Sequence, residues 1–309
     1  MKKWSLLLVA AMISIVLAAC SMDSGSKSDD SSASEGSKDS SDKSIGLSIS
    51  TLNNPFFVTL SDSAEAKAKE NGVKITVSDA QDDASKQASD VENLIQKGVD
   101  LIIINPVDSS SVASAVESAN AANIPVITVD RSSEGGEVVA HIASDNVAGG
   151  ELAGEFLMSL IEEGSEVAML EGVAGSSAAR DRGQGFLNVV DGKVNLVASQ
   201  TANFNRTEGL TVMENILQAN PNVKAIFAQN DEMALGALEA IQAAGKDIIV
   251  IGFDATDDAV AKVESGDLAA TVAQQPALIG EKAIEAAVKV LAGESVEANI
   301  PVELELISK

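Results

Sequence analysis

Residues 73–104 read VKITVSDAQDDASKQASDVENLIQKGVDLIII, and this stretch decides the fold class. The runs at 73–78 and 101–104 are rich in β-branched residues, which is typical of buried strands. Residues 85–97 between them have a helical pattern, closed by Gly98 in the position where glycine commonly ends a helix. A strand, a helix and a second strand in this order predict a βαβ unit and a parallel sheet.

The same alternation continues from Ser44 to the end of the chain, with a further helix expected at 58–71 before Gly72. Ten strands are more than one open sheet of this size usually holds. The sequence therefore predicts an α/β protein with two doubly wound parallel-sheet lobes. The expected strands are residues 45–50, 73–78, 101–104, 126–129, 138–142, 166–170, 196–199, 225–228, 248–251 and 269–272.

Open α/β sheets bind ligands beyond the carboxyl ends of their strands. Those positions carry aromatic, amide and charged side chains here. They include residues 53–57, Asn105, Asp130, Arg131, Arg180, Arg182, Phe204, Asn230, Asp231, Phe253, Asp254 and Gln274.

Four of the seven phenylalanines lie at these strand exits, where exposure to solvent is expected, and a binding cleft explains them better than a core does. Aromatic faces suit the C–H surface of a sugar, while amide, carboxylate and guanidinium groups suit its hydroxyls. Asp130 and Asp254 are balanced by Arg131 and Arg182, so the expected pocket is neutral and favours an uncharged polyhydroxylated ligand.

Each of these residues also has a structural alternative. Asn54 and Pro55 fit turn chemistry, and Asp130 fits a helix N-cap. The pair Phe56 and Phe57 fits the core of a lobe.

Composition excludes several classes of function. The net charge of −25 argues against a nucleic-acid partner, because phosphate binding needs clustered Lys and Arg. The spread of acidic residues favours a solvated surface, with an acidic patch for a basic partner as the alternative. One Cys and one His exclude an internal disulfide and the usual zinc shell, and no metal or cofactor is expected.

The N-terminus is typical of an export signal. Lys2 and Lys3 precede an apolar run that is too short to span a bilayer comfortably, and the run ends in two alanines before Cys20. This ending resembles the lipobox of bacterial lipoproteins, which implies lipidation of Cys20 and a signal at 1–20. The alternative is a plain secretory signal. Residues 21–43, mostly Ser, Asp, Gly, Lys and Glu, are expected to be a disordered tether.

Seven segments, in order and at matching spacing, resemble the periplasmic ribose-binding proteins, and the similarity covers nearly all of residues 44–309. The segments are STLNNPFF at 50–57, INP at 104–106, IPVITVDR at 124–131, HIASDN at 141–146, SAARDRG at 177–183, FAQNDEMALG at 227–236 and GFD at 252–254.

This resemblance implies two lobes joined by three crossing strands, which close over one sugar in a hinge motion and deliver it to an ABC permease. It implies a first lobe of 44–143 plus 275–302 and a second of 144–274 plus 303–309. A monomer, lipid-anchored on the extracytoplasmic face of the cell membrane, is expected. The implied ribose contacts are Asn54, Phe56, Phe57, Asn105, Asp130, Arg131, Arg182, Phe204, Asn230, Phe253, Asp254 and Gln274.

Three other functions compete with ribose transport. The first is transport of another sugar, because relatives on this scaffold bind allose, galactose, xylose or furanosyl signalling molecules. A sugar-responsive transcription regulator would need an N-terminal helix-turn-helix, where this chain has an export signal and a tether. A sugar-processing enzyme would need a free acid and base, whereas Asp130 and Asp254 are each matched with an arginine that keeps the carboxylate ionised.

Three further features favour structural roles. His141 lies within an expected strand, so a structural histidine is favoured over a catalytic one. The glycine-rich stretch 172–177 lacks the ending of a P-loop and is expected to support Arg182. Residues 254–258 are acidic but lack the glycine and distal Glu of an EF-hand, so a helix cap explains them.

Overall fold

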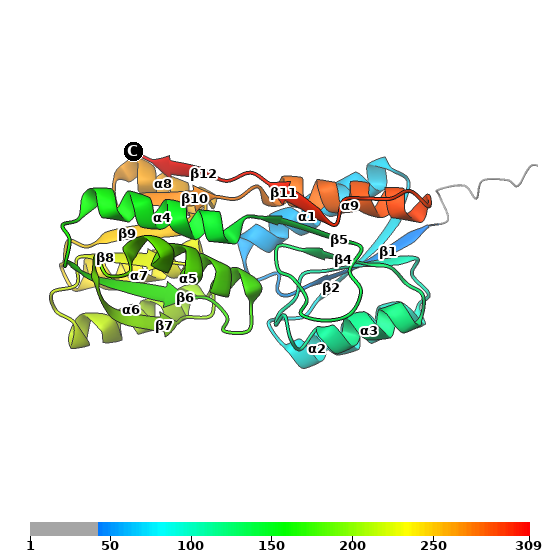
Figure 1. Cartoon of the computed structure of the whole chain (residues 1–309), viewed down its shortest axis with the longest axis horizontal. Helices are drawn as coiled ribbons and strands as arrows, with labels where there is room; N and C mark the ends of the chain where they lie inside the picture. The colour runs from blue at the N-terminus through cyan, green and yellow to red at the C-terminus, as the bar shows by residue number, and fades with distance from the viewer. Residues whose placement is uncertain (1–42) are drawn as a thin grey trace, which may run out of the picture. The chain divides into compact units, whose positions relative to one another are not determined.

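The computed structural model describes residues 43–309, and these contain twelve strands and nine helices. The strands form two six-stranded sheets, each covered by helices on both faces (Figure 1). The expected α/β fold with two lobes is confirmed.

All neighbouring strands of the first sheet pair in parallel, in the order β11-β5-β4-β3-β1-β2. Its strands are β1 (Ser44–Ile49), β2 (Lys74–Asp79), β3 (Leu101–Ile104), β4 (Val126–Val129), β5 (Ala140–Ser144) and β11 (Asn299–Val302).

The second sheet has the order β12-β10-β9-β8-β6-β7, and only the β10 and β12 pair is antiparallel. Its strands are β6 (Glu166–Glu171), β7 (Asn195–Thr201), β8 (Ala225–Ala228), β9 (Ile249–Asp254), β10 (Ala270–Ala273) and β12 (Glu305–Ser308).

The helices follow the strands in sequence. Around the first sheet lie α1 (Pro55–Glu70), α2 (Ala84–Gln96), α3 (Ala113–Ala121) and α9 (Pro276–Leu291). Around the second lie α4 (Asn146–Leu160), α5 (Ser177–Val190), α6 (Arg206–Ala219), α7 (Asp231–Ala243) and α8 (Asp257–Ser265).

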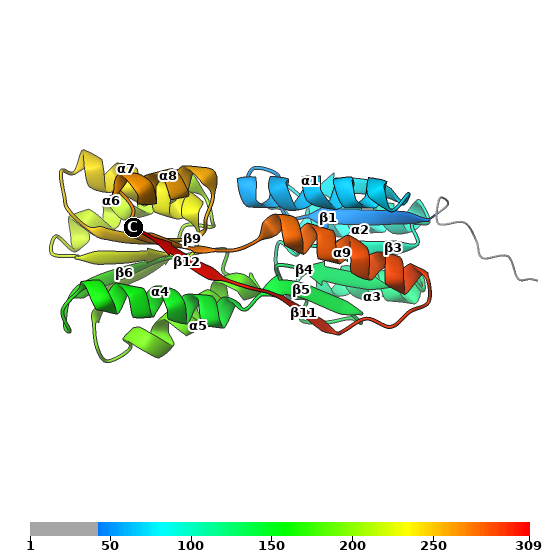
Figure 2. The ribbon, with the colours of Figure 1, turned by 90° about the horizontal axis from the view of Figure 1, so that it is seen from above.

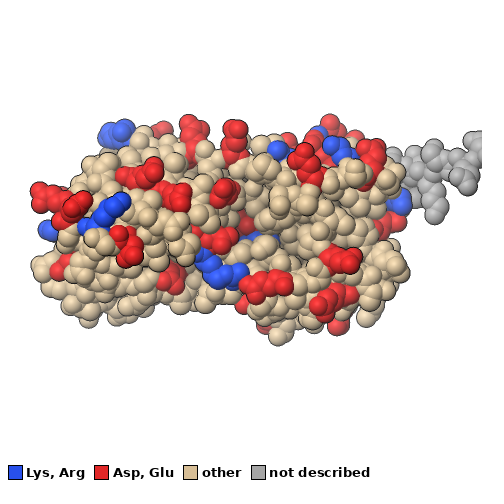
Figure 3. All heavy atoms as spheres, in the orientation of Figure 1, with Lys and Arg blue, Asp and Glu red and all other residues tan. Residues whose placement is uncertain are grey.

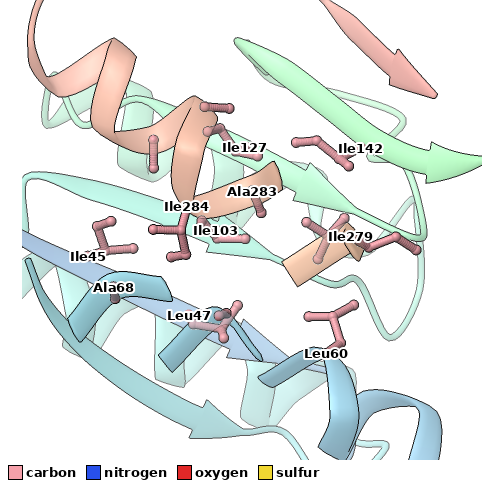
Figure 4. Packing of buried hydrophobic residues seen from close by; sticks show 14 of the residues in the cluster. Ile45, Leu47, Leu60, Ala68, Ile103, Ile127, Ile142, Ile279, Ala283 and Ile284 are labelled. Carbon is pink, nitrogen blue, oxygen red and sulfur yellow. The ribbon is translucent and has the colours of Figure 1, made fainter. Parts of the chain in front are cut away.

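Strand β3 shows why a run of isoleucines forms the centre of the first sheet. Successive side chains of a strand point to opposite faces, so an inner strand covered on both sides is apolar throughout. Ile103 packs with α1 and α9, as Figure 4 shows, while Ile102 and Ile104 pack with α2 and α3. All three are fully buried. The second sheet is divided in the same way between α4 and α5 on one face and α6, α7 and α8 on the other.

Helix α1 begins at Pro55, three residues before the start expected from the sequence. The Asn54 side chain accepts a hydrogen bond from Phe56 N at 2.9 Å and caps the helix. Proline at the first position suits the helix because its missing N–H would have had no partner there. Phe56 and Phe57 are therefore helical residues in the first turn.

The C-terminal strands β11 and β12 were not among the ten expected strands. Strand β11 contains Pro301, which hides a strand pattern but is tolerated at an edge, where β11 lies. Strand β12 is short and partly exposed, so its apolar pattern is weak.

The chain passes between the two sheets at three places, which Figure 2 shows. It leaves the first sheet after β5, returns to it after β10 and leaves it again after β11.

Candidate binding site

A small cavity lies beyond the carboxyl ends of strands from both sheets, and its roughly 230 Å³ of space free of protein atoms includes volume that is open to solvent. Ten of the twelve expected site residues line it, together with Ala178, which was not expected. The lining residues are Asn54, Phe56, Phe57, Asp130, Arg131, Ala178, Arg182, Phe204, Asn230, Asp254 and Gln274.

The other two expected residues, Asn105 and Phe253, do not line the cavity but contact residues that do. The Asn105 amide donates to Val129 O at 3.1 Å and to Asp130 Oδ2 at 3.4 Å. The ring of Phe253 lies 4.0 Å from the guanidinium carbon of Arg182. Both residues therefore hold the charged groups of the site in place.

Two aspartates and two arginines form a buried charged group in the cavity wall. Arg131 Nε lies 3.6 Å from Asp130 Oδ2, and Arg182 lies 3.9 Å from Asp130 Oδ1 and 3.8 Å from Asp254 Oδ1. Each of the four side chains is at most 5% exposed. The two aspartates therefore lie beside the two arginines, as expected from the sequence. Buried ionisable groups are normally paired with groups of opposite charge in this way.

Three buried atoms of the cavity residues have no hydrogen-bond partner within residues 43–309. They are Asp130 Oδ1, Arg131 Nε and Gln274 Oε1. Buried polar atoms are normally paired, since an unmade hydrogen bond costs about 1–3 kcal/mol. Such atoms in a cavity wall point to a polar ligand that supplies both donors and acceptors.

Burial affects the ionisation of the site. It raises the pKa of Asp254 well above its ordinary value, and the nearby Arg182 opposes this change. Burial also lowers the pKa of Arg131, with Asp130 opposing it. The pairing with arginine led us to expect Asp254 to stay readily ionised. The structure corrects this, because loss of solvent outweighs an arginine that lies 3.8 Å away.

The phenylalanines of the site pack against the arginines. The Arg131 guanidinium carbon lies 5.1 Å from the ring centroids of both Phe57 and Phe204, and Arg182 lies 5.7 Å from that of Phe204. Planar guanidinium groups interact favourably with aromatic faces at such distances. The side chains of Phe56, Phe57 and Phe204 are also buried, although residues that follow a strand are usually exposed to solvent.

Structural roles coexist with the cavity. Phe56 and Phe57 belong to the hydrophobic core of the first lobe, which confirms their structural alternative. Asn54 caps α1, and Asn230 caps α7 by accepting from Met233 N at 3.0 Å. The Asn230 amide also donates to Phe204 O at 3.3 Å. Asp130 is not a helix cap: it follows β4 with a φ of 62°, a left-handed conformation that turns the chain at the strand end.

The sequence did not indicate how Arg182 is held. Its Nε donates to Asn146 Oδ1 at 2.8 Å, and its Nη1 donates to Gln229 O at 2.8 Å. Asn146 lies in the HIASDN segment and Gln229 in the FAQNDEMALG segment, both of which resemble the ribose-binding proteins. That resemblance could have indicated that the two residues matter, but not that they bind Arg182.

Contacts across the cleft join the loops of the first sheet to α5 and the loop before it. Ser109 N donates to Gly175 O at 2.9 Å, Ser177 N donates to Ser109 Oγ at 3.1 Å, and Ser132 N donates to Ser177 Oγ at 2.9 Å. Arg180 also pairs with Glu134 at 2.6 Å. These bonds keep the two lobes together around the cavity.

His141, the glycine-rich stretch 172–177 and the acidic segment 254–258 were expected to have structural roles, and each makes structural contacts. His141 Nδ1 lies 2.9 Å from Thr128 Oγ1, and burial lowers its pKa. In the glycine-rich stretch, Ser176 caps α5, the helix that carries Arg182, and Gly172 lies against the ring of Phe204. Thr256, within the acidic segment, is the N-cap residue of α8.

The described residues contain no group of three His, Cys, Asp or Glu side chains able to hold a metal ion. Within residues 43–309, no helix is long and apolar enough to cross a membrane. On the face drawn in Figure 3, acidic side chains are spread over the surface and basic ones are sparse. The expected signal, Cys20 and all of the expected tether except Lys43 lie outside the described residues.

A family model described as "Periplasmic binding protein domain" matches residues 45–295. The chain is 57% identical over 262 residues to the "Ribose import binding protein RbsB" of Bacillus subtilis, covering 85% of this chain and 86% of that protein. It is 52% identical over 271 residues to the protein of the same name from Haemophilus influenzae, covering 87% and 93%.

Among solved structures, an ABC transporter periplasmic solute binding protein from Actinobacillus succinogenes with bound D-allose aligns with a TM-score of 0.80 at 32% identity. The alignment covers 86% of this chain and 97% of that one. These proteins are named for binding and import, and this chain, like them, is not an enzyme. Because the family model spans most of the sequence and two relatives share more than half of their aligned residues with it, the chain belongs to the periplasmic binding protein domain family.

Proposed function

We propose that this chain is the receptor of an ABC importer, which captures D-ribose in the cavity and delivers it to the membrane permease. The observation that carries the proposal is the set of unpartnered buried atoms Asp130 Oδ1, Arg131 Nε and Gln274 Oε1. A sugar hydroxyl both donates and accepts hydrogen bonds, so one small sugar can satisfy oxygens and an N–H group together.

The rest of the cavity wall supports an uncharged sugar. Phe56, Phe57 and Phe204 offer apolar faces to C–H groups. Two buried aspartates and two buried arginines lie side by side there, so the wall offers both acceptors and donors to the hydroxyl groups of a sugar. Asn54 and Asn230 add amides to the wall.

The choice of ribose is supported by the names of the two bacterial relatives described above. The alternative is the same transport role for another monosaccharide, namely allose, galactose, xylose or a furanosyl signalling molecule. It is supported by the D-allose bound to the related protein from Actinobacillus succinogenes.

The transport cycle that we propose is a hinge closure of two lobes, residues 44–143 plus 275–302 and residues 144–274 plus 303–309. The three connections between the sheets would act as the hinge, and the sugar would favour the closed form by binding it more tightly. The proposal is supported by the bonds that Ser109 and Ser132 make with the segment around Ser177. We expect each lobe to face one half of the permease.

The anchor that we propose is a lipid on Cys20, which would hold a monomer at the extracytoplasmic face of the cell membrane. It is supported by the position of this cysteine after a short apolar run. Replacing Cys20 with Ser should release the protein from the membrane fraction and remove the mass of the lipid. A C20S protein that stays in that fraction with an unchanged modification would contradict the anchor.

The identity of the sugar is tested by thermal shift and calorimetry on residues 44–309, with D-ribose, D-allose, D-galactose and D-xylose as the ligands. A ligand at about 100 times its Kd stabilises the fold by about 2.7 kcal/mol, which raises the melting temperature. We expect D-ribose to give the largest shift and to be recovered chemically unaltered. If D-ribose leaves the melting temperature unchanged while another sugar raises it, ribose is the wrong ligand.

A further inference from the structure

The orientation of Arg182 is not fixed by the carboxylates beside it. Its guanidinium nitrogens lie 3.9 Å from Asp130 and 3.8 Å from Asp254, beyond the length of a hydrogen bond. These contacts are attractive but do not select a direction, because charge attraction at this range depends weakly on angle.

Two shorter contacts do select a direction. Arg182 Nε donates to Asn146 Oδ1 and Nη1 donates to Gln229 O, both at 2.8 Å. The ring of Phe253 lies 4.0 Å from the guanidinium carbon and packs against its face. While Nε and Nη1 donate to Asn146 and Gln229, Nη2 has no such short contact in the described part of the chain and lies 3.9 Å from Oδ1 of Asp130, a cavity residue.

Asn146 occupies a special place in the chain. It is the first residue of α4, just after the connection by which the chain leaves β5 for the second sheet. It is only 7% exposed, and its amide donates to Ser144 O at 3.4 Å. Asn146 does not line the cavity, so it contacts the arginine without reaching the ligand's space.

From these contacts we infer that Asn146 is a positioning residue: its side-chain oxygen fixes the Arg182 guanidinium for the sugar and ties it to the connection after β5. The inference rests on the proposed function, in which Arg182 binds the sugar. It adds a specific link between the ligand and one of the segments that join the lobes. Gln229 uses its main-chain carbonyl, so Asn146 provides the side-chain acceptor for this arginine.

The first test compares Asn146→Ala with Asn146→Asp in calorimetric titrations with D-ribose. The alanine variant leaves Arg182 Nε without its acceptor and should weaken binding by about tenfold or more, because a hydrogen bond to a charged group is involved. The aspartate variant keeps an acceptor and should remain within about threefold of the wild type. Equal affinity of the alanine variant and the wild type would overturn the inference. Should the alanine variant fail to fold, Asn146→Ser, whose hydroxyl is too short to reach, replaces it.

The second test is a double-mutant cycle with Arg182→Lys, which lacks the Nε–H group. If Asn146 acts through Arg182, the alanine substitution should have little further effect on D-ribose affinity in the lysine background. The same loss in both backgrounds would mean that Asn146 has a general structural role, and would refute the inference.

A third measurement needs no sugar and therefore separates this inference from the proposed function. In a spectrum of ¹⁵N-labelled arginine side chains, the Nε–H of Arg182 is assigned by its absence from Arg182→Lys. We expect a slowly exchanging signal in the wild type and in Asn146→Asp, and fast exchange in Asn146→Ala. Slow exchange in the alanine variant would show that Asn146 does not hold the arginine. Failure of the wild type to bind D-ribose would count against the function alone.

Discussion

Arg180 and Glu134 join the two lobes by a solvent-exposed ion pair. Arg180 Nη2, on α5, donates to Glu134 Oε1 at 2.6 Å, and Glu134 lies in the segment between β4 and β5. Their side chains are 46% and 47% exposed. The pair therefore joins the two lobes in contact with solvent, whereas the four charges of the cavity wall are buried.

Breaking this pair should have a small effect on sugar affinity. Exposed ion pairs contribute about 0–1 kcal/mol, so Glu134→Gln should weaken D-ribose binding by less than about fivefold. The loss should shrink further at high salt, which screens exposed charges. Glu137→Gln, an exposed glutamate in the same segment, is the matched control. Calorimetry at low and high salt checks this, and a salt-independent loss of more than about tenfold would contradict it.

The buried charges should behave differently. Arg182→Ala leaves Asp130 and Asp254 with less compensating charge, and Asp254→Ala does the same to Arg182. Each change should weaken D-ribose binding by at least about 2 kcal/mol while the fold is retained. Arg180→Ala, on the same helix but directed to Glu134, is the control and should lose far less. Unchanged affinity in both cavity variants would remove these residues from the site.

Gly172 should be essential for the position of Phe204. A Cβ atom at Gly172 would lie 2.0 Å from Phe204 Cζ, so the ring must move in Gly172→Ala. The ring has little room to do so, because Phe204 is buried and packs against the guanidinium groups of Arg131 and Arg182. We expect Gly172→Ala and Phe204→Ala to reduce D-ribose affinity to a similar degree, and the double variant to be no worse than either. Additive losses in a calorimetric cycle would show that the two positions act separately.

The stability of the ligand-free protein should fall as the pH rises from about 4 to about 7. Burial raises the pKa of Asp231 from 3.8 to about 7, against the hydrogen bonds that its carboxylate accepts from Thr256 and Thr271. The folded protein therefore holds a proton that the unfolded chain has released, and this contribution to stability is lost as the pH approaches 7. The raised pKa of Asp254 acts in the same direction.

Asp231→Asn removes this proton equilibrium, so its stability should depend less steeply on pH over that window. Denaturant unfolding at several pH values between about 4 and 7.5 measures the difference. Asp191→Asn, an exposed aspartate, is the control for the loss of one acidic group. Parallel stability curves for Asp231→Asn and the wild type would show that Asp231 is ionised throughout.

The fold class and most of the cavity wall could be predicted from the amino-acid sequence alone. The alternation of apolar runs and helical patterns is local information, and parallel strands place their carboxyl ends at one edge of the sheet. Reading the residues after each strand therefore brought Asp130, Arg131, Asn230, Asp254 and Gln274 to the same cavity that the structure shows.

The hydrogen-bond partners of those residues and their burial from solvent depend on the tertiary structure. Strand β11 forms by pairing with β5, and Arg182 takes its direction from Asn146 and Gln229. Asp254 loses its solvent because residues of both lobes enclose the cavity. Contacts between distant segments leave no periodic pattern in the sequence, and desolvation depends on every group around an atom. Hydrogen-bond direction and burial at this site could therefore be known only after folding.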